Sequence, residues 1–207
     1  MTSSFRYGAV EIVYLKHACF MLKGSKVVYI DPYELQGQLD KADVVLATHD
    51  HFDHLDMKSL KIISKPETVL VIPKGCFVEG YKVCELAVGE EMDLGGVKVK
   101  AVPAYNVGKP FHKRGECVGY IVELDGVRVY HAGDTDRIPE MKKIEVDIAL
   151  LPIGGTYTMD VKEAAEAAKD IKAKYYIPMH FGIPGTRADP KEFAKLVENA
   201  VVLEPLL

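Results

Sequence analysis

The chain has 207 residues, of which 48% are hydrophobic, and its formal net charge is −4. This length allows one large domain or two small ones, and the composition can supply a substantial buried core. Because charges of both signs are interspersed, nucleic acid and anionic membrane surfaces are not expected as partners. No apolar stretch approaches the roughly 18 residues that a membrane-spanning helix needs.

The first half of the chain is predicted to be mostly strand. Short β-rich runs cover residues 10–15, 19–22, 26–30, 43–47, 69–72, 81–86 and 97–102. After residue 54, Asp56 can cap a short helix that reaches about Ser64. A hairpin of strands 119–124 and 127–131 is predicted from the turn signal Asp125-Gly126.

The second half of the chain alternates strand and helix. Strands are predicted at residues 147–151, 175–178 and 201–203, and helices at 160–172 and 189–199. Two sheets packed face to face with helices outside would cover the strands that are apolar on both faces. We therefore predict the α/β fold class, as a four-layer αββα sandwich that forms a single domain over residues 1–207.

The N-terminal segment and the cysteines bear on location. Residues 1–6 lack the apolar core of a signal peptide, so a cytoplasmic protein is expected. None of the four cysteines forms a C-x-x-C pair. Free thiols are the expectation in a cytosolic chain, although Cys76 and Cys84 could bridge. The oligomeric state stays open, with a homo-oligomer as one option.

A cluster of histidines and aspartates directly follows the predicted strand 43–47. Residues 48–54 read Thr-His-Asp-His-Phe-Asp-His and contain three of the chain's seven histidines. Imidazole and carboxylate are the ligands that zinc, manganese and iron prefer. Side chains two apart in an extended segment point the same way, so His49 and His51 can hold one ion, and Asp53 and His54 can reach a second. The alternative is a histidine-rich surface loop, but such loops seldom repeat ligand types directly after a core strand.

Two further candidate ligands also follow predicted strands. Asp134 comes after the hairpin strand 127–131, and His180 follows strand 175–178. A turn aspartate and a lone histidine are weak signals by themselves. Beside the first motif, Asp134 becomes a candidate bridge between two ions and His180 a candidate ligand of the second.

These motifs resemble the metallo-β-lactamase superfamily. The segments that carry the resemblance are residues 48–54, residues 130–136 (YHAGDTD) and residues 177–182 (IPMHFG). More narrowly, the chain is similar to the branch that includes ascorbate-6-phosphate lactonase and N-acyl-phosphatidylethanolamine phospholipase D. It shares with that branch Leu15-Lys16-His17-Ala18 and Ile30-Asp31-Pro32.

The resemblance implies a metal centre with assigned ligands. One ion would be held by His49 and His51, the other by Asp53, His54 and His180, with Asp134 between them. Asp53 and His54 would also take part in catalysis. One or two Zn²⁺ ions are expected, with Mn²⁺ or Fe²⁺ as alternatives.

One family ligand has no counterpart at its usual position. A further histidine usually follows the strand that is residues 97–104 here, where this chain has Asn106. An amide oxygen is a weaker zinc ligand than imidazole. The first ion would therefore bind loosely, recruit His112, or take water or substrate. The substitution Asn106→His is expected to strengthen binding of the first ion.

Three other residues are expected to orient ligands rather than bind metal. His131 shares a strand face with Val127 and Val129, which favours a hydrogen-bonded place behind the site. His17 follows a strand, and Asp31 can accept a hydrogen bond from a ligating imidazole.

The predicted function is that of a metal-dependent hydrolase. A metal-bound hydroxide would cleave a small, anionic ester or lactone. Lys109 and Arg114 would attract the substrate, Tyr157 would form an apolar wall, and Gly154-Gly155 would bring backbone N–H groups close. A phosphodiesterase or nuclease is one alternative, although a net acidic chain argues against it. A metal-binding module with little catalysis, because of Asn106, is the other.

Overall fold

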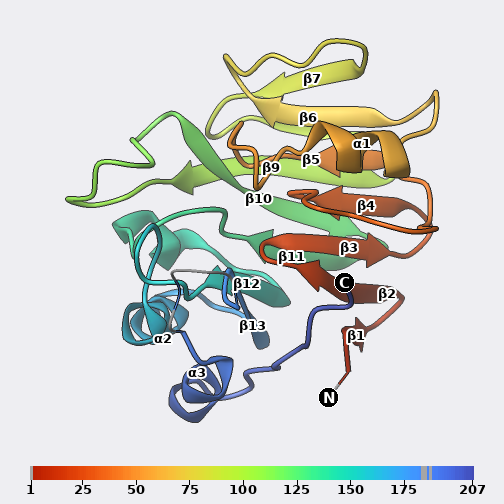
Figure 1. Ribbon diagram of the computed structural model, residues 1–207. Helices are drawn as coiled ribbons and strands as arrows, with labels where there is room; N and C mark the ends of the chain where they lie inside the picture. Colours follow the sequence, from red (N-terminus) through yellow and green to blue (C-terminus); the bar gives the residue numbers. More distant parts are fainter. Residues whose placement is uncertain (1, 183–185, 187) are drawn as a thin grey trace.

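The computed structural model describes residues 2–182, 186 and 188–207. Its centre is a pair of mixed β-sheets, one of seven strands and one of six. Helices lie against the outer faces of the pair (Figure 1). The predicted αββα sandwich is therefore confirmed.

The seven-stranded sheet follows the order of the chain. Neighbouring strands are antiparallel from β1 to β4 and parallel from β4 to β7. Its strands are β1 (Ser4–Tyr7), β2 (Val10–Lys16), β3 (Cys19–Lys23), β4 (Val27–Ile30), β5 (Val44–Leu46), β6 (Val69–Pro73) and β7 (Lys82–Leu86).

The six-stranded sheet has the order β13-β12-β11-β10-β9-β8. It is antiparallel from β8 to β11 and parallel from β11 to β13, so both sheets change from antiparallel to parallel pairing. Its strands are β8 (Glu91–Asp93), β9 (Val97–Ala104), β10 (Cys117–Leu124), β11 (Val127–His131), β12 (Ile148–Pro152) and β13 (Tyr175–Met179).

Each α-helix begins after an aspartate that caps it. Asp56 accepts from the N–H groups of Lys58 and Ser59, Asp160 from Glu163, and Asp189 from Lys191. These caps satisfy N–H groups that have no partner within the helix. The helices are α1 (Met57–Ile63), α2 (Val161–Asp170) and α3 (Pro190–Leu196), with a 3₁₀ helix, η1, at Pro139–Lys143.

Two buried apolar clusters hold the layers together. The larger lies between the sheets, where Tyr14 and Phe20 of one sheet join Tyr120 of the other, and it continues to the buried face of α2. The smaller includes Leu60 of α1 and the outer face of the seven-stranded sheet. Burial of these side chains from water is the main contribution to the stability of such a fold.

The structure corrects several predicted elements. Strands β1 and β8 and helix η1 were not predicted, and α3 ends at Leu196 rather than near residue 199. The predicted strand 201–203 is wrong. After a single bridge between Tyr176 and Ala200, the chain leaves the sheet, and the Leu206 N–H donates to the Tyr14 carbonyl (3.1 Å). A short apolar run at a chain end does not reveal that it has no continuous partner strand.

Two other expectations can be compared with the structure. All four cysteines, including Cys76 and Cys84, are free. No helix among the described residues is long and apolar enough to cross a membrane.

Hydrogen bonds join the two sheets where the histidine motif begins. The Tyr120 hydroxyl of β10 donates to the Ala47 carbonyl at 3.0 Å, and the Val118 N–H donates to the Thr48 carbonyl at 3.0 Å. Tyr120 is fully buried. The six-stranded sheet therefore fixes the backbone directly before His49.

Replacing Tyr120 by phenylalanine tests this link between the sheets. Tyr120→Phe leaves the buried Ala47 carbonyl without its donor, so the free energy of unfolding should fall by about 1–3 kcal/mol. Urea denaturation followed by circular dichroism measures this change. An unchanged free energy of unfolding would show that the hydroxyl does not stabilise the sheet pair.

Candidate metal centre

All seven histidines of the chain lie at or beside one edge of the two-sheet sandwich. The motif of residues 48–54 follows β5, Asp134 follows β11, and His180 follows β13. His112 lies in the connection from β9 to β10. Parallel strands present their carboxyl ends at the same edge of a sheet, where binding sites commonly form. The topology thus brings distant parts of the chain together.

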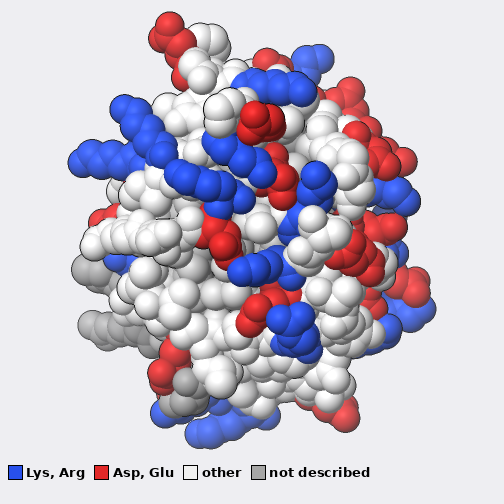
Figure 2. Space-filling view, turned by 90° about the vertical axis from the view of Figure 1, so that its right-hand side faces the viewer, with Lys and Arg blue, Asp and Glu red and all other residues white. Residues whose placement is uncertain are grey.

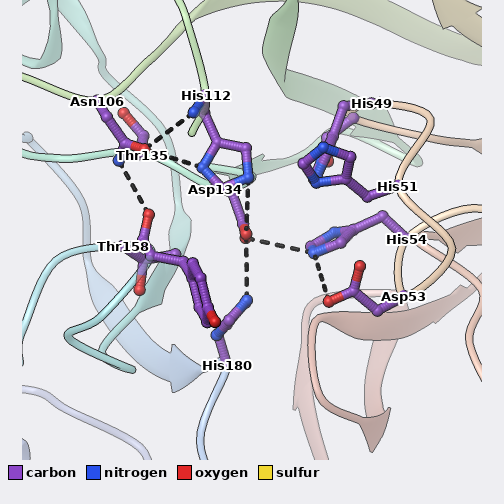
Figure 3. Close-up of polar contacts among 12 residues, drawn as sticks. His49, His51, Asp53, His54, Asn106, His112, Asp134, Thr135, Thr158 and His180 are labelled. Carbon is purple, nitrogen blue, oxygen red and sulfur yellow. Dashed lines mark hydrogen bonds and ion pairs between the residues drawn. The ribbon is translucent and has the colours of Figure 1, made fainter. Parts of the chain in front are cut away.

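Asp134 lies at the centre of this group, as Figure 3 shows. Its Oδ2 is 3.2 Å from His180 Nε2 and 3.4 Å from His112 Nε2. Its Oδ1 is 3.4 Å from His54 Nε2. One carboxylate is therefore surrounded by imidazoles from three separate segments, and its two oxygens face different neighbours.

Three overlapping groups of side chains can each hold a metal ion, because their ligand atoms all lie within 4.8 Å of one another. The structure therefore assembles all six residues that were predicted as ligands, together with His112, the predicted alternative for the first ion, and His17, which was not predicted as a ligand. The groups are His49, His51 and His112; His17, Asp53, His54 and His180; and His49, His54 and Asp134.

Hydrogen bonds from behind the site fix several of these imidazole rings. His54 Nδ1 lies 2.7 Å from Asp31 Oδ2, and His49 Nδ1 lies 3.0 Å from the Thr48 hydroxyl. That hydroxyl donates in turn to Asp31 at 2.8 Å. His54 Nε2 is left to face Asp134, and His49 Nε2 lies 3.0 Å from His51 Nδ1. Such outer partners are typical of metal-binding histidines. Asp31 has the orienting position predicted for it, whereas the part played by Thr48 was missed.

Asn106 orients His112. Its Oδ1 lies 3.0 Å from both the backbone nitrogen and Nδ1 of His112. Its Nδ2 donates to Asp136 at 3.1 Å and to the Tyr157 carbonyl at 2.9 Å. Both ends of the amide are therefore engaged, and the ring that faces the group belongs to His112. Of the alternatives for the missing histidine, this geometry favours His112.

His131 and His17, which were both predicted to orient ligands, occupy different positions relative to the site. His131 lies 2.8 Å from the Ala18 carbonyl through Nε2 and accepts from the Gly133 N–H through Nδ1, so it stays behind the site as predicted. His17 differs from the prediction, because its Nε2 lies 3.3 Å from Asp53 Oδ2 within a ligand group. Since the His180 N–H donates to the His17 carbonyl at 2.8 Å, contact between the sheets brings this ring inward.

The buried polar atoms of the site fit a bound cation. Seven buried side-chain atoms in the described part of the chain have no hydrogen-bond partner. Six of them belong to His17, His54, Asp134 and His180. Buried polar atoms rarely remain unpaired, and an ion is one usual explanation for them. The donor set of imidazoles and carboxylates suits zinc, manganese or iron.

The charges of the site also favour a cation. Burial opposes ionisation of Asp134, yet His180 and His54 hold its pKa well below the usual value. Burial would lower the pKa of His54, but the carboxylates of Asp134 and Asp31 raise it well above the usual value. Burial and His54 together keep the pKa of His49 well below its usual value, which maintains the neutral form that binds metal. The site thus presents anionic carboxylates that attract positive charge.

Backbone strain is concentrated at this site. Six non-glycine residues in the described part of the chain have positive φ, and three of them are His17, Asp31 and His180, with φ of 56°, 50° and 59°. Such conformations persist where surrounding structure imposes them, often at functional sites. At Gly133, just before Asp134, φ is +65° and a Cβ would lie 2.8 Å from the Val118 carbonyl. Glycine is therefore required there.

A pocket of about 620 Å³ opens over the group. Tyr157 lines it, in agreement with its predicted position as an apolar wall. It is lined by Asp50, His51, Phe52, Asp53, Phe111, His112, Asp134, Tyr157 and His180.

Lys109 and Arg114, predicted to bind substrate, do not line this pocket. Lys109 Nζ donates to Asp136 at 2.5 Å and to the Thr158 carbonyl at 2.7 Å. Arg114 donates to Glu140 at 2.7 Å. Both cations pair with carboxylates that the sequence order does not place beside them, and substrate binding by these two residues stays a prediction.

The glycine pair after β12 also differs from its predicted use. The Gly155 N–H donates to the Met159 carbonyl at 3.0 Å, so it is engaged within its own loop. At Gly154, a Cβ would lie 2.6 Å from the His180 carbonyl oxygen and 2.9 Å from His180 Nδ1. Gly154 therefore makes room for His180 rather than for substrate.

Comparison with known proteins agrees with this architecture. Residues 11–180 match the family model described as the beta-lactamase superfamily domain. A UPF0173 metal-dependent hydrolase of Pyrococcus furiosus is 38% identical, over 95% of this chain and 97% of that protein. One from Methanoregula boonei is 37% identical, over 96% and 94%.

Solved structures give the same result. A crystal structure described as that of a metal-dependent hydrolase from Parabacteroides distasonis has a TM-score of 0.88, with 32% identity over 99% of both chains. Igni18, described as a metallo hydrolase from Ignicoccus hospitalis, has a TM-score of 0.80, with 29% identity over 95% of both chains. The chain therefore belongs to the beta-lactamase superfamily, among its UPF0173 metal-dependent hydrolases.

Proposed function

We propose that this metal-dependent hydrolase binds two divalent ions and hydrolyses a carboxylic ester or lactone. The observation that carries the proposal is the position of Asp134, whose two oxygens lie 3.2–3.4 Å from imidazole nitrogens of His54, His112 and His180. A carboxylate so placed can bridge two ions. Zinc is the favoured metal, with manganese or iron as alternatives, since imidazole and carboxylate ligands suit all three.

The ligands divide between the two ions. His49, His51 and His112 would hold the first ion, and Asp53, His54 and His180 the second, with Asp134 shared. His17 can add a nitrogen to the second set, because it lies in the same group. The full imidazole set at the first ion argues against a metal-binding module without catalysis, because Asn106 costs this site no ligand.

The proposed chemistry follows from the donor set. Ions held by imidazoles and carboxylates lower the pKa of a coordinated water enough to make it a nucleophile near neutral pH. Asp53 is partly exposed and lines the pocket, so its carboxylate can accept a hydrogen bond from the attacking water and orient it. Asp31 holds His54 from behind and keeps its Nε2 directed to the centre.

A nuclease remains the less favoured alternative. On the face that Figure 2 shows, Lys and Arg lie among Asp and Glu rather than in a block of one sign. Proteins that bind nucleic acid usually present a basic patch or stripe. We also propose a cytoplasmic location, which the four free cysteines support.

The direct test is reconstitution of metal-depleted protein with zinc, manganese or iron. The reconstituted protein is then assayed with nitrophenyl esters, lactones and bis-nitrophenyl phosphate. We expect hydrolysis of an ester or lactone that disappears with chelator and returns with metal. Turnover of the phosphodiester alone would favour the nuclease, and binding of two ions without any turnover would overturn the proposal.

Asp134→Asn tests the shared carboxylate. The amide is a weaker ligand and lacks the negative charge that balances two cations, so metal content should fall below one ion per chain. Ester hydrolysis should fall at least about 100-fold. Mass-spectrometric metal analysis and initial rates measure both quantities. The exposed-site variant Asp125→Asn serves as the control, with metal content expected to be unchanged. Two retained ions in Asp134→Asn would refute the bridge.

Asn106→Ala tests the orientation of His112. Loss of the acceptor for His112 Nδ1 should weaken binding of the first ion by about 10–100-fold. The second ion is the internal control, since its ligands do not contact Asn106. Asn106→His should weaken the first ion as well, contrary to the prediction from sequence. Competition titration with a chromophoric chelator resolves the two affinities, and tighter binding in either variant would contradict this account.

Gly154→Ala tests the space that His180 needs. The new Cβ would push His180 away, so binding of the second ion should weaken by at least about 10-fold. Gly24→Ala is a matched control, because its Cβ would lie 2.3 Å from Asp125 Oδ2, in another turn. The control should lose stability but keep both ions. Equal metal affinity in the two variants would show that crowding at Gly154 does not act on the site.

A further inference from the structure

The pocket over the metal centre has an aromatic wall built from three separate loops. Phe52 belongs to the histidine motif, Phe111 to the β9–β10 connection, and Tyr157 to the loop after β12. Phe52 is 75% exposed, and the other two are 41% and 45% exposed. The rings of Phe111 and Tyr157 meet edge to face, with centroids 4.7 Å apart. Large apolar side chains left open at a pocket mark a binding surface.

The acidic and basic side chains that line the same pocket are aspartates and histidines, and the histidines belong to the candidate metal-binding groups. Its lining, among the described residues, contains no Lys or Arg. The exposed carboxylate that lines it, Asp50, would repel an anionic substrate. Lys109 and Arg114, which the sequence suggested for substrate binding, are paired with Asp136 and Glu140. Among the described residues that line the pocket, no Lys or Arg offers positive charge to a substrate.

We propose that the substrate is a neutral ester or lactone with an apolar acyl or aryl group that packs against Phe52, Phe111 and Tyr157. This inference rests on the proposed function and specifies the substrate class. It differs from the anionic substrate predicted from the sequence, because Lys109 and Arg114 pair with Asp136 and Glu140. The pocket volume of about 620 Å³ lies within the usual range for small-molecule sites.

The reaction in this pocket balances without any further reactant. The oxygen of water adds to the carbonyl carbon, the bond from that carbon to the ester oxygen breaks, and the two protons of water are shared between the products. The products are a carboxylic acid, which ionises, and an alcohol or phenol. A lactone gives one hydroxy acid.

The test uses a series of nitrophenyl esters on the metal-loaded protein. The acyl chain is extended from acetyl to hexanoyl, and one ester carries a terminal carboxylate on a chain of equal length. We expect kcat/KM to rise about fourfold for each methylene that the pocket buries. We expect the terminal carboxylate to lower kcat/KM at least about tenfold, because Asp50 repels it and no Lys or Arg is found among the described lining residues.

Variants assign this selectivity to the aromatic wall. In Phe111→Ala and Phe52→Ala, the rise per methylene should fall to about twofold or less, while metal analysis verifies both ions. Leu196→Ala removes an exposed apolar side chain of α3 that does not line the pocket, and its chain-length dependence should equal that of the unaltered protein.

A binding measurement separates failure of this inference from failure of the proposed function. Hydroxamic acids bind metal without turnover, so calorimetric affinities of acetohydroxamic and hexanohydroxamic acid report on the wall alone. Tighter binding of the longer compound, lost in Phe111→Ala, supports the apolar subsite even if no ester is cleaved. Ester hydrolysis that is independent of chain length, or a preference for the terminal carboxylate, would overturn the inference and leave the hydrolase intact.

Discussion

The buried carboxylate of Asp134 is the feature on which the whole site depends. It is 3% exposed, and its neighbours are imidazoles that come from the motif loop, the β9–β10 connection and the end of β13. A buried anion is costly unless positive charge and hydrogen bonds compensate it. Against the effect of burial, the carboxylates of Asp134 and Asp31 hold the pKa of His54 well above its usual value, which shows how strongly this cluster favours positive charge. Two divalent ions would provide it more completely.

The fold supplies the rigidity that such a site requires. Asp31, Thr48 and Asn106 hold the imidazoles from behind, while the Tyr120 hydroxyl anchors the backbone before His49 to the other sheet. The strained backbone at His17 and His180 is maintained by contacts between the sheets, including the hydrogen bond from the His180 N–H to the His17 carbonyl. Ligand geometry that depends on packed sheet ends is more exact than geometry on free loops.

The sequence predicted those parts of the site that depend on local order. His49, His51, Asp53 and His54 share one short loop after a core strand, so their closeness in the sequence places them together. Asp134 and His180 needed the additional knowledge that parallel strands end at one edge. His17 could not be placed among the ligands, because only the contact between the two sheets brings its ring beside Asp53.

The differences from the prediction concern pairings between distant residues. Lys109 and Arg114 looked free to bind an anion, but they pair with Asp136 and Glu140, which follow strands β10 and β11 in the chain. The strand predicted at residues 201–203 has suitable residues but no continuous partner. In both cases the residue types fitted the prediction, and the difference comes from contacts with residues that are distant in the chain. Asp136, two residues after the candidate ligand Asp134, was the one sequence feature that could have indicated the hydrogen bond from Asn106.

Anomalous diffraction from crystals grown with zinc would test the central claim most directly. Data collected on both sides of the zinc absorption edge locate each ion independently of the protein coordinates. This account predicts two peaks about 3.5–4 Å apart, one on each side of the Asp134 carboxylate, with His112 rather than Asn106 bound to the first. A single peak, or a first ion that contacts Asn106 and leaves His112 free, would contradict it.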